Sequence, residues 1–156
     1  MYCLALPEPL CCEQGETNLA VVHTWTGETS LVRILVADDN PAVRRYLRGL
    51  LEQQVDWLVC DEVSNGQEAV ERVQQAKPDL IVLDFQMPGM NGLDAARRIA
   101  DLSPKTPILM VTIHLSKQLS EEARKVGIRG ACAKTDISSV VEAVGALLRE
   151  ETYFPN

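Results

Sequence analysis

The chain has 156 residues, of which 46% are hydrophobic and 24% are charged, a balance typical of one soluble globular domain with a substantial core. Its formal net charge of -7 argues against a basic surface that binds nucleic acid, and no apolar run is long enough to cross a bilayer. The N-terminus lacks the basic start of a signal peptide. We therefore expect a cytoplasmic protein that neither enters a membrane nor contacts nucleic acid directly.

Five cysteines occur at irregular spacing, and two of them are adjacent, Cys11 and Cys12. An odd number without regular spacing argues against a disulfide framework, and adjacent cysteines do not suit a CxxC metal site. Cys60 and Cys132 fall in apolar runs and are expected to be core residues. This use of cysteine favours a reducing compartment.

The chain divides into three parts by composition. Residues 1–30 contain no Lys or Arg and show weak periodicity, so we expect an N-terminal extension, flexible or preceding the true domain start. Residues 31–151 carry the regular pattern of a folded domain, and residues 152–156 are expected to be a C-terminal tail or the start of a linker.

Within the predicted domain, short apolar runs alternate with stretches of helical periodicity. The apolar runs predict strands at 31–37, 56–63, 80–84, 107–112 and 131–133. The helical stretches are 41–51, 67–76, 93–100, 116–126 and 137–150. Five alternations of strand and helix predict an α/β fold in which a parallel five-stranded sheet carries helices on both faces.

Polar residues stand where four of these strands end. Asp38 and Asp39 follow the first strand, Asp84 ends the third, Thr112 ends the fourth, and Lys134 follows the fifth. Because parallel strands share one direction, these side chains are expected along one edge of the sheet, where α/β folds bind ligands.

Three carboxylates in one place repel one another, and a divalent cation is the natural compensation. The ligands are oxygen atoms, which favours Mg²⁺ or Mn²⁺ over zinc. Lys134 and Thr112 add a positive charge and a hydrogen-bond donor for phosphoryl oxygens. The combination is typical of phosphoryl transfer to a carboxylate, with Asp84 as the nucleophile.

The segment Asp84–Gly92, DFQMPGMNG, together with the acidic pair, Thr112 and Lys134, resembles the receiver domains of bacterial two-component response regulators. The resemblance extends from about residue 31 to about residue 151. It implies a flavodoxin-like, CheY-like (βα)5 doubly wound fold. The endings of the fifth strand and fifth helix are closest in style to the NarL/LuxR-type subfamily, whose helix-turn-helix output has no counterpart in these 156 residues.

The resemblance also implies roles for the site residues. A histidine kinase or phosphotransfer protein would donate a phosphoryl group to Asp84. Mg²⁺ would be held by Asp39, Asp84 and the backbone carbonyl of Gln86, with Asp38 acting through water. Lys134 would pair with the phosphoryl group, and Thr112 would move to hydrogen-bond it. The chain would catalyse its own phosphorylation and slow dephosphorylation, and it would act by phosphorylation-controlled association.

The chain departs from the family pattern at two positions near the site. Most receivers have an aromatic residue three positions before the lysine, where this chain has Ala131. The usual coupling from the threonine to the outer face is therefore in question. Ile113 is bulkier than the small residue common after the threonine, which predicts slower phosphoryl access. The face of the fourth helix, fifth strand and fifth helix is the family's usual output and dimer surface, so a second copy of the chain is a candidate partner there.

Three alternatives remain open. A haloacid-dehalogenase-type phosphatase also uses an aspartyl nucleophile, but it needs a second Asp two residues later, where Gln86 stands. A flavin-binding module would need a phosphate loop after the first strand, where the acidic pair would repel a phosphate. A receiver-like interaction module that does not signal by phosphorylation is favoured by Ala131 and opposed by the complete set of site residues.

Overall fold

The computed structural model describes residues 30–155, in which five strands and five α-helices alternate along the chain. The strands are β1 (Val32–Ala37), β2 (Trp57–Val63), β3 (Leu80–Asp84), β4 (Ile108–Thr112) and β5 (Gly130–Ala133). The helices are α1 (Pro41–Leu51), α2 (Gly66–Ala76), α3 (Gly92–Leu102), α4 (Lys117–Lys125) and α5 (Ser139–Leu148), with a 3-10 helix η1 (Lys134–Asp136) before α5. The expected N-terminal extension lies outside the described residues, apart from Ser30.

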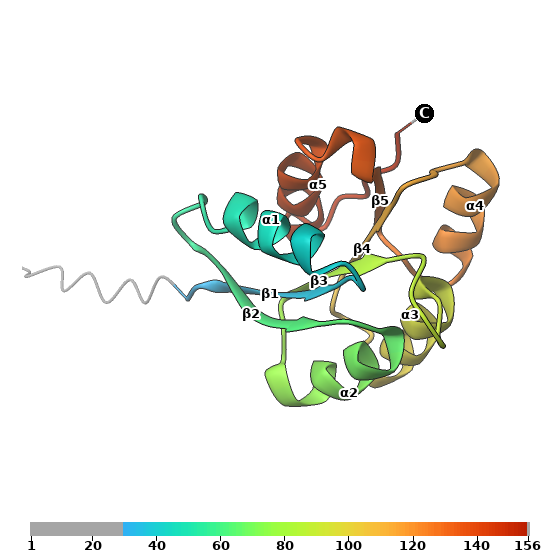
Figure 1. Cartoon of the computed structure of the whole chain (residues 1–156), viewed down its shortest axis with the longest axis horizontal. Coiled ribbons are helices and arrows are strands. Elements are labelled where there is room, and N and C mark those ends of the chain that lie inside the picture. The colour runs from blue at the N-terminus through green and yellow to red at the C-terminus, as the bar shows by residue number, and fades with distance from the viewer. Residues whose placement is uncertain (1–29, 156) are drawn as a thin grey trace, which may run out of the picture.

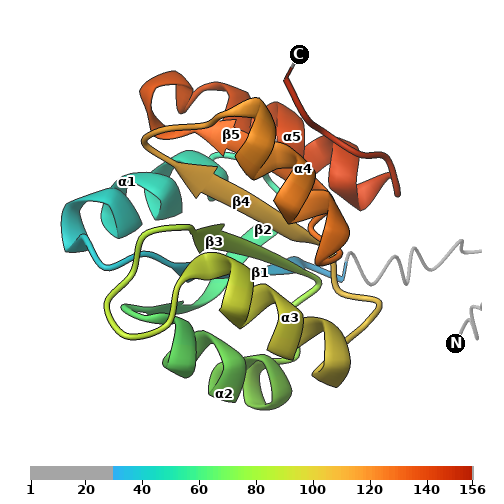
Figure 2. The same ribbon diagram turned by 90° about the vertical axis from the view of Figure 1, so that its right-hand side faces the viewer.

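The strands form one parallel sheet in the order β2-β1-β3-β4-β5, with helices on both faces (Figure 1). Helices α1 and α5 cover one face, while α2, α3 and α4 cover the other (Figure 2). The predicted doubly wound, flavodoxin-like fold is confirmed. The direction of winding reverses between β1 and β3, which places a crevice between the ends of these two strands.

A separate apolar cluster fills each side of the sheet. All five residues of β3 and all five of β4 are buried, because both strands lie inside the sheet between two helical layers. The cluster under α1 and α5 includes Val36 and Val82, and the cluster under α2, α3 and α4 includes Leu35 and Leu83. Cys132 is buried as expected, whereas Cys60 is half-buried.

Short polar side chains begin four of the helices. Asn40, Asn65, Asn91 and Ser116 are N-caps, and each accepts a hydrogen bond from a backbone N–H in the first turn of its helix. No helix within residues 30–155 is long and apolar enough to cross a bilayer.

Helix α5 begins two residues later than predicted, because the chain first forms η1 after Lys134. Two serines stabilise this turn. Ser138 Oγ donates to Asp136 Oδ1 at 2.8 Å, and Ser139 Oγ donates to the Asp136 carbonyl at 2.7 Å. Side-chain bonds of this kind compete with the start of a regular helix.

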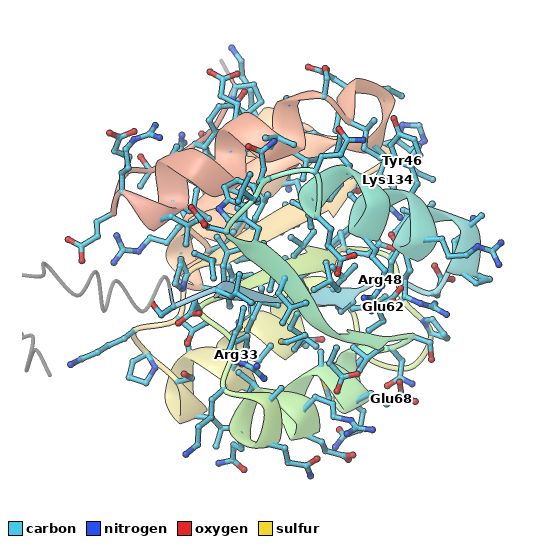
Figure 3. The ribbon with its side chains drawn as sticks, turned by 90° about the vertical axis from the view of Figure 1, so that its left-hand side faces the viewer. Arg33, Tyr46, Arg48, Glu62, Glu68 and Lys134 are labelled. Carbon is cyan, nitrogen blue, oxygen red and sulfur yellow. The ribbon has the colours of Figure 1, made fainter. Side chains whose placement is uncertain are left out.

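A partly exposed ion pair connects α1 to the edge strand β2. Arg48 of α1 points toward Glu62 of β2 in Figure 3, and its Nη2 lies 2.6 Å from Glu62 Oε2. Arg48 also pairs with Glu52 at 3.1 Å.

Candidate functional site

The first part of the site is the turn that joins β1 to α1. Asp38 is 1% exposed, and its Oδ1 accepts a hydrogen bond from the Asn40 N–H at 2.9 Å. Asp39 is exposed. Arg44 Nη1 donates to the Asp38 carbonyl at 2.6 Å, which holds the turn against the first turn of α1. The two acids therefore differ in setting: one is fixed inside the crevice and the other faces solvent at its mouth.

The second part is the end of β3 and the loop that follows it. Asp84 is 3% exposed, and its Oδ1 accepts a hydrogen bond from the Gln86 N–H at 3.3 Å. The loop turns back so that the Gly92 N–H donates to the Phe85 carbonyl at 2.8 Å. A Cβ atom on Gly92 would lie 2.4 Å from the Asp84 carbonyl oxygen, so only glycine allows α3 to begin this close to the strand.

Lys134 joins the two buried acids. Its Nζ lies 2.6 Å from Asp38 Oδ2 and 3.1 Å from Asp84 Oδ2, and its side chain is 12% exposed. The contact with Asp38 is a short ion pair between two buried groups. Lys134 reaches this position because β5 ends beside β4 and directs the next residue over the crevice.

Burial and neighbouring charges shift the pKa values of two of these groups. Burial raises the pKa of Asp84 above its ordinary value of 3.8; Lys134 opposes this rise, and the Asp38 charge adds to it. Burial lowers the pKa of Lys134, but Asp38 and Asp84 outweigh that effect and bring it above its ordinary value of 10.5. Lys134 is therefore cationic at neutral pH, and its charge is shared between two acids.

The carboxylates suit a divalent cation. One oxygen each from Asp38, Asp39 and Asp84 lies within 4.8 Å of the others. Ion pairs from the described residues reach Asp38 and Asp84 through Lys134, and none reaches Asp39. Three negative charges against one ammonium leave an excess that a hard cation with oxygen ligands would offset, and Mg²⁺ prefers such ligands.

A shallow pocket of about 390 Å³ gives access to Asp84. Its lining includes Asp39 and Gln86, as the sequence predicted, and also Asn40, Val43 and Ile113. Asn40 is also the N-cap of α1, and Val43 is half-buried on the same helix. The half-exposed Ile113 is placed here because it directly follows β4.

Two predicted site residues are less directly connected. Thr112 ends β4 at the same edge of the sheet and is 1% exposed, but no hydrogen bond links it to Asp38, Asp84 or Lys134. Gln86 lies at the pocket, where its N–H contacts Asp84. The structure therefore brings Asp38, Asp39, Asp84 and Lys134 together and holds Thr112 next to them, while the roles assigned to these residues stay predictions.

The hydrogen bond from Arg44 to the Asp38 carbonyl was not expected from the sequence. A signal for it exists, because a basic residue in the first turn of a helix opposes the helix dipole and calls for another partner. That partner is the Asp38 carbonyl.

Comparison with known proteins decides the family. The family model described as "Response regulator receiver domain" matches residues 34–145, which is most of the chain. The chain belongs to the response regulator receiver family. It is thus a receiver domain of the two-component type, with a CheY-like fold.

The relatives of this receiver include both single-domain and longer proteins. It is 34% identical to the chemotaxis protein CheY of Thermotoga maritima, over 72% of this chain and 93% of that protein. It is 32% identical to the uncharacterized transcriptional regulatory protein YxjL of Bacillus subtilis, over 79% of this chain and 57% of that protein. The chain spans little more than half the length of the transcriptional regulators it matches.

Solved structures agree with this assignment. A LuxR-family two-component response regulator from Aurantimonas sp. SI85-9A1 superposes with a TM-score of 0.77 at 30% identity, over 80% of this chain and 89% of that one. The signal receiver domain of the putative response regulator NarL from Mycobacterium tuberculosis superposes with a TM-score of 0.72 at 26% identity, over 77% of this chain and 98% of that one. The predicted likeness to NarL/LuxR-type receivers is confirmed.

Proposed function

We propose that this receiver accepts a phosphoryl group on Asp84 from a histidine kinase or phosphotransfer protein and acts by phosphorylation-controlled association. One observation carries the proposal. Asp84 is a buried carboxylate at the winding reversal, it opens onto a pocket, and its Oδ2 lies 3.1 Å from a cationic lysine. A carboxylate held in this way is placed to attack a phosphorus atom in the pocket.

In the proposed transfer, an Asp84 oxygen forms the new bond to phosphorus while the bond between phosphorus and the donor's imidazole nitrogen breaks. The electron pair of that bond remains on the nitrogen. Lys134 keeps its charge at neutral pH and would offset the negative charge of the phosphoryl oxygens, and Thr112, at the end of the neighbouring strand β4, would donate a hydrogen bond to them. The same residues would serve in slow hydrolysis of the acyl phosphate.

Asp39, Asp84 and the backbone carbonyl of Gln86 would hold the Mg²⁺ or Mn²⁺ ion, with Asp38 acting through water. When bound, the cation supplies positive charge that stabilises the phosphoryl oxygens and offsets the excess of carboxylates. The three carboxylate oxygens within 4.8 Å of one another support this assignment.

A second candidate is a receiver that associates with partners without phosphorylation. The observation that favours it is Ala131, which is fully buried in β5 where most receivers have an aromatic side chain. Homodimerisation through α4, β5 and α5 fits either candidate.

Intact mass spectrometry after incubation with acetyl phosphate, with and without Mg²⁺, separates the two candidates. The expected result is a Mg²⁺-dependent gain of one phosphoryl group in the wild-type chain, absent in Asp84→Asn and retained in Asp101→Asn. Asp101 is the matched control because it is an exposed carboxylate on α3, away from the crevice. A folded wild-type chain that gains no phosphoryl group would exclude phosphorylation and leave the interaction module.

A further inference from the structure

Arg44 on α1 holds the backbone of the acidic turn rather than a carboxylate. Its Nη1 donates a hydrogen bond of 2.6 Å to the Asp38 carbonyl, and its side chain is half-buried. Among the described residues, the ion pairs of Asp38 and Asp84 are those with Lys134, and no ion pair joins Arg44 to an acid. A guanidinium beside acidic side chains normally pairs with a carboxylate. This one instead fixes the chain that carries the acids.

The next turn of α1 shows the usual arrangement. Arg48 lies four residues later on the same side of the helix and pairs with two carboxylates, Glu62 at 2.6 Å and Glu52 at 3.1 Å (Figure 3). Arg48 thus connects α1 to β2, while Arg44 connects α1 to the end of β1. The loss of Arg44 alone leaves the other connection in place, so the effect of Arg44 on the site can be measured in a folded chain.

Each polar group of Asp38 has a partner. Its N–H donates to the Val63 carbonyl at 3.1 Å, its Oδ1 accepts from the Asn40 N–H at 2.9 Å, and its Oδ2 lies 2.6 Å from Lys134 Nζ. These contacts hold the strand and the side chain. The carbonyl, which points toward the next residue's peptide unit, is held by Arg44.

The position of Asp39 depends on the direction of the Asp38 carbonyl. Asp39 is exposed, and no ion pair from the described residues reaches it, yet one of its oxygens lies within 4.8 Å of oxygens of Asp38 and Asp84. Because a peptide unit is planar, a fixed Asp38 carbonyl also fixes the direction in which the chain continues to Asp39. The backbone therefore sets where the Asp39 carboxylate can reach.

We propose that Arg44 is a positioning residue of the cation site, which directs the Asp39 carboxylate toward Mg²⁺ by holding the Asp38 carbonyl. The proposal rests on the proposed function, in which Asp39 is a ligand of the cation. The charge of Arg44 acts in the opposite direction, because a guanidinium beside the site repels a cation. Loss of positioning weakens the binding of Mg²⁺ and loss of charge strengthens it, so substitution of Arg44 separates the two effects.

The experiment is a titration of Mg²⁺ into the ¹⁵N-labelled full chain, followed by the amide shifts of Asp39 and Gln86. Arg44→Met removes the charge and the donor but keeps a long side chain, whereas Arg44→Lys keeps a charge and a donor. Arg45→Met is the matched control, because Arg45 is exposed on the same helix and its loss removes the same charge without removing the bond to Asp38. Urea unfolding shows whether each variant is folded, and Arg44→Gln replaces Arg44→Met if the latter is not.

Arg44→Met is expected to raise the dissociation constant for Mg²⁺ by at least about tenfold, as residues that orient metal ligands do. Arg44→Lys should retain most of the affinity, and Arg45→Met should bind Mg²⁺ as well as the wild-type chain or more tightly. An unchanged or lower dissociation constant in folded Arg44→Met would overturn the proposal, as would an equal loss in Arg45→Met or no recovery in Arg44→Lys. A wild-type chain that binds no Mg²⁺ would instead overturn the cation site of the proposed function, and this proposal with it.

Discussion

Gly92→Ala should damage the fold and the site together. The added Cβ would lie 2.4 Å from the Asp84 carbonyl oxygen, whereas ordinary contact begins at 3.4 Å, so the strand end and the helix start must separate by about 1 Å. Overpacking of this kind costs about 1–3 kcal/mol. The lower chain entropy of alanine in the unfolded state returns about 0.4–1 kcal/mol. We therefore expect a net loss of about 1–2 kcal/mol in the free energy of unfolding.

Gly49→Ala is the matched control, because Gly49 is exposed on α1 and a Cβ there would meet nothing within 4 Å. It should gain about 0.5–1 kcal/mol from helix propensity. Urea unfolding followed by circular dichroism gives both free energies. The rate of phosphorylation by acetyl phosphate, measured by intact mass, should fall at least about tenfold in Gly92→Ala, since a 1 Å misplacement of a reacting group can cost about a hundredfold. A Gly92→Ala chain with wild-type stability and rate would refute the argument from close approach.

Three further predictions concern single side chains. Glu150 has a left-handed backbone conformation with a φ of 64°, which glycine adopts without strain. Glu150→Gly should therefore raise the free energy of unfolding by about 0.5–1 kcal/mol, and urea unfolding that shows no gain would contradict this. The Ser64 N–H donates a hydrogen bond to Glu68, and this bond, with other local bonds, brings the pKa of Glu68 below its ordinary value of 4.5. The ionised Glu68 therefore adds to the free energy of unfolding above pH 4.5, and this stabilisation is lost as the pH falls through the folded-state pKa. In Glu68→Gln, the free energy of unfolding should therefore fall less steeply as the pH is lowered from 7 to 3. An unchanged pH dependence would mean that other carboxylates cause it. Ile113→Ala should speed phosphorylation of Asp84 several-fold with little change in stability, because the side chain is half-exposed at the pocket; an unchanged rate in the intact-mass assay would show that it does not limit access.

Much of the fold follows from periodicity alone. β3 was predicted to the residue because its apolar run is bounded by a proline turn and an acid, and the five alternations left a parallel sheet as the natural arrangement. The boundaries of α3 and α5 were less accurate. A side-chain hydrogen bond from Ser139 to the Asp136 carbonyl delays the start of α5, and the periodic pattern of the sequence does not mark the turn at Lys134–Asp136.

The sequence predicts those site residues that stand at the ends of strands. Shared strand direction is enough to bring Asp38, Asp84 and Lys134 together, and the structure gives their contacts. Shared strand direction does not reveal the other side chains at the entrance of the pocket: Val43 carries no chemical signal, and Ile113 was expected there only from the resemblance to receivers. The pairing of Tyr153 with β5 was also beyond prediction, because it rests on two backbone hydrogen bonds, to Arg129 and Ala131, rather than on a periodic pattern.

Under the proposed function, the sharing of Lys134 between two acids should make the binding of an anion and the binding of a cation at this site reinforce each other. A phosphoryl group that draws the ammonium away from Asp38 leaves a carboxylate that is 1% exposed without its counter-charge, and a cation restores that balance. Conversely, a cation that satisfies the acids frees Lys134 for an incoming anion. Under the proposed function, thermodynamic reciprocity then requires that each ligand raise the affinity for the other by the same factor, so the two ligands would not bind independently.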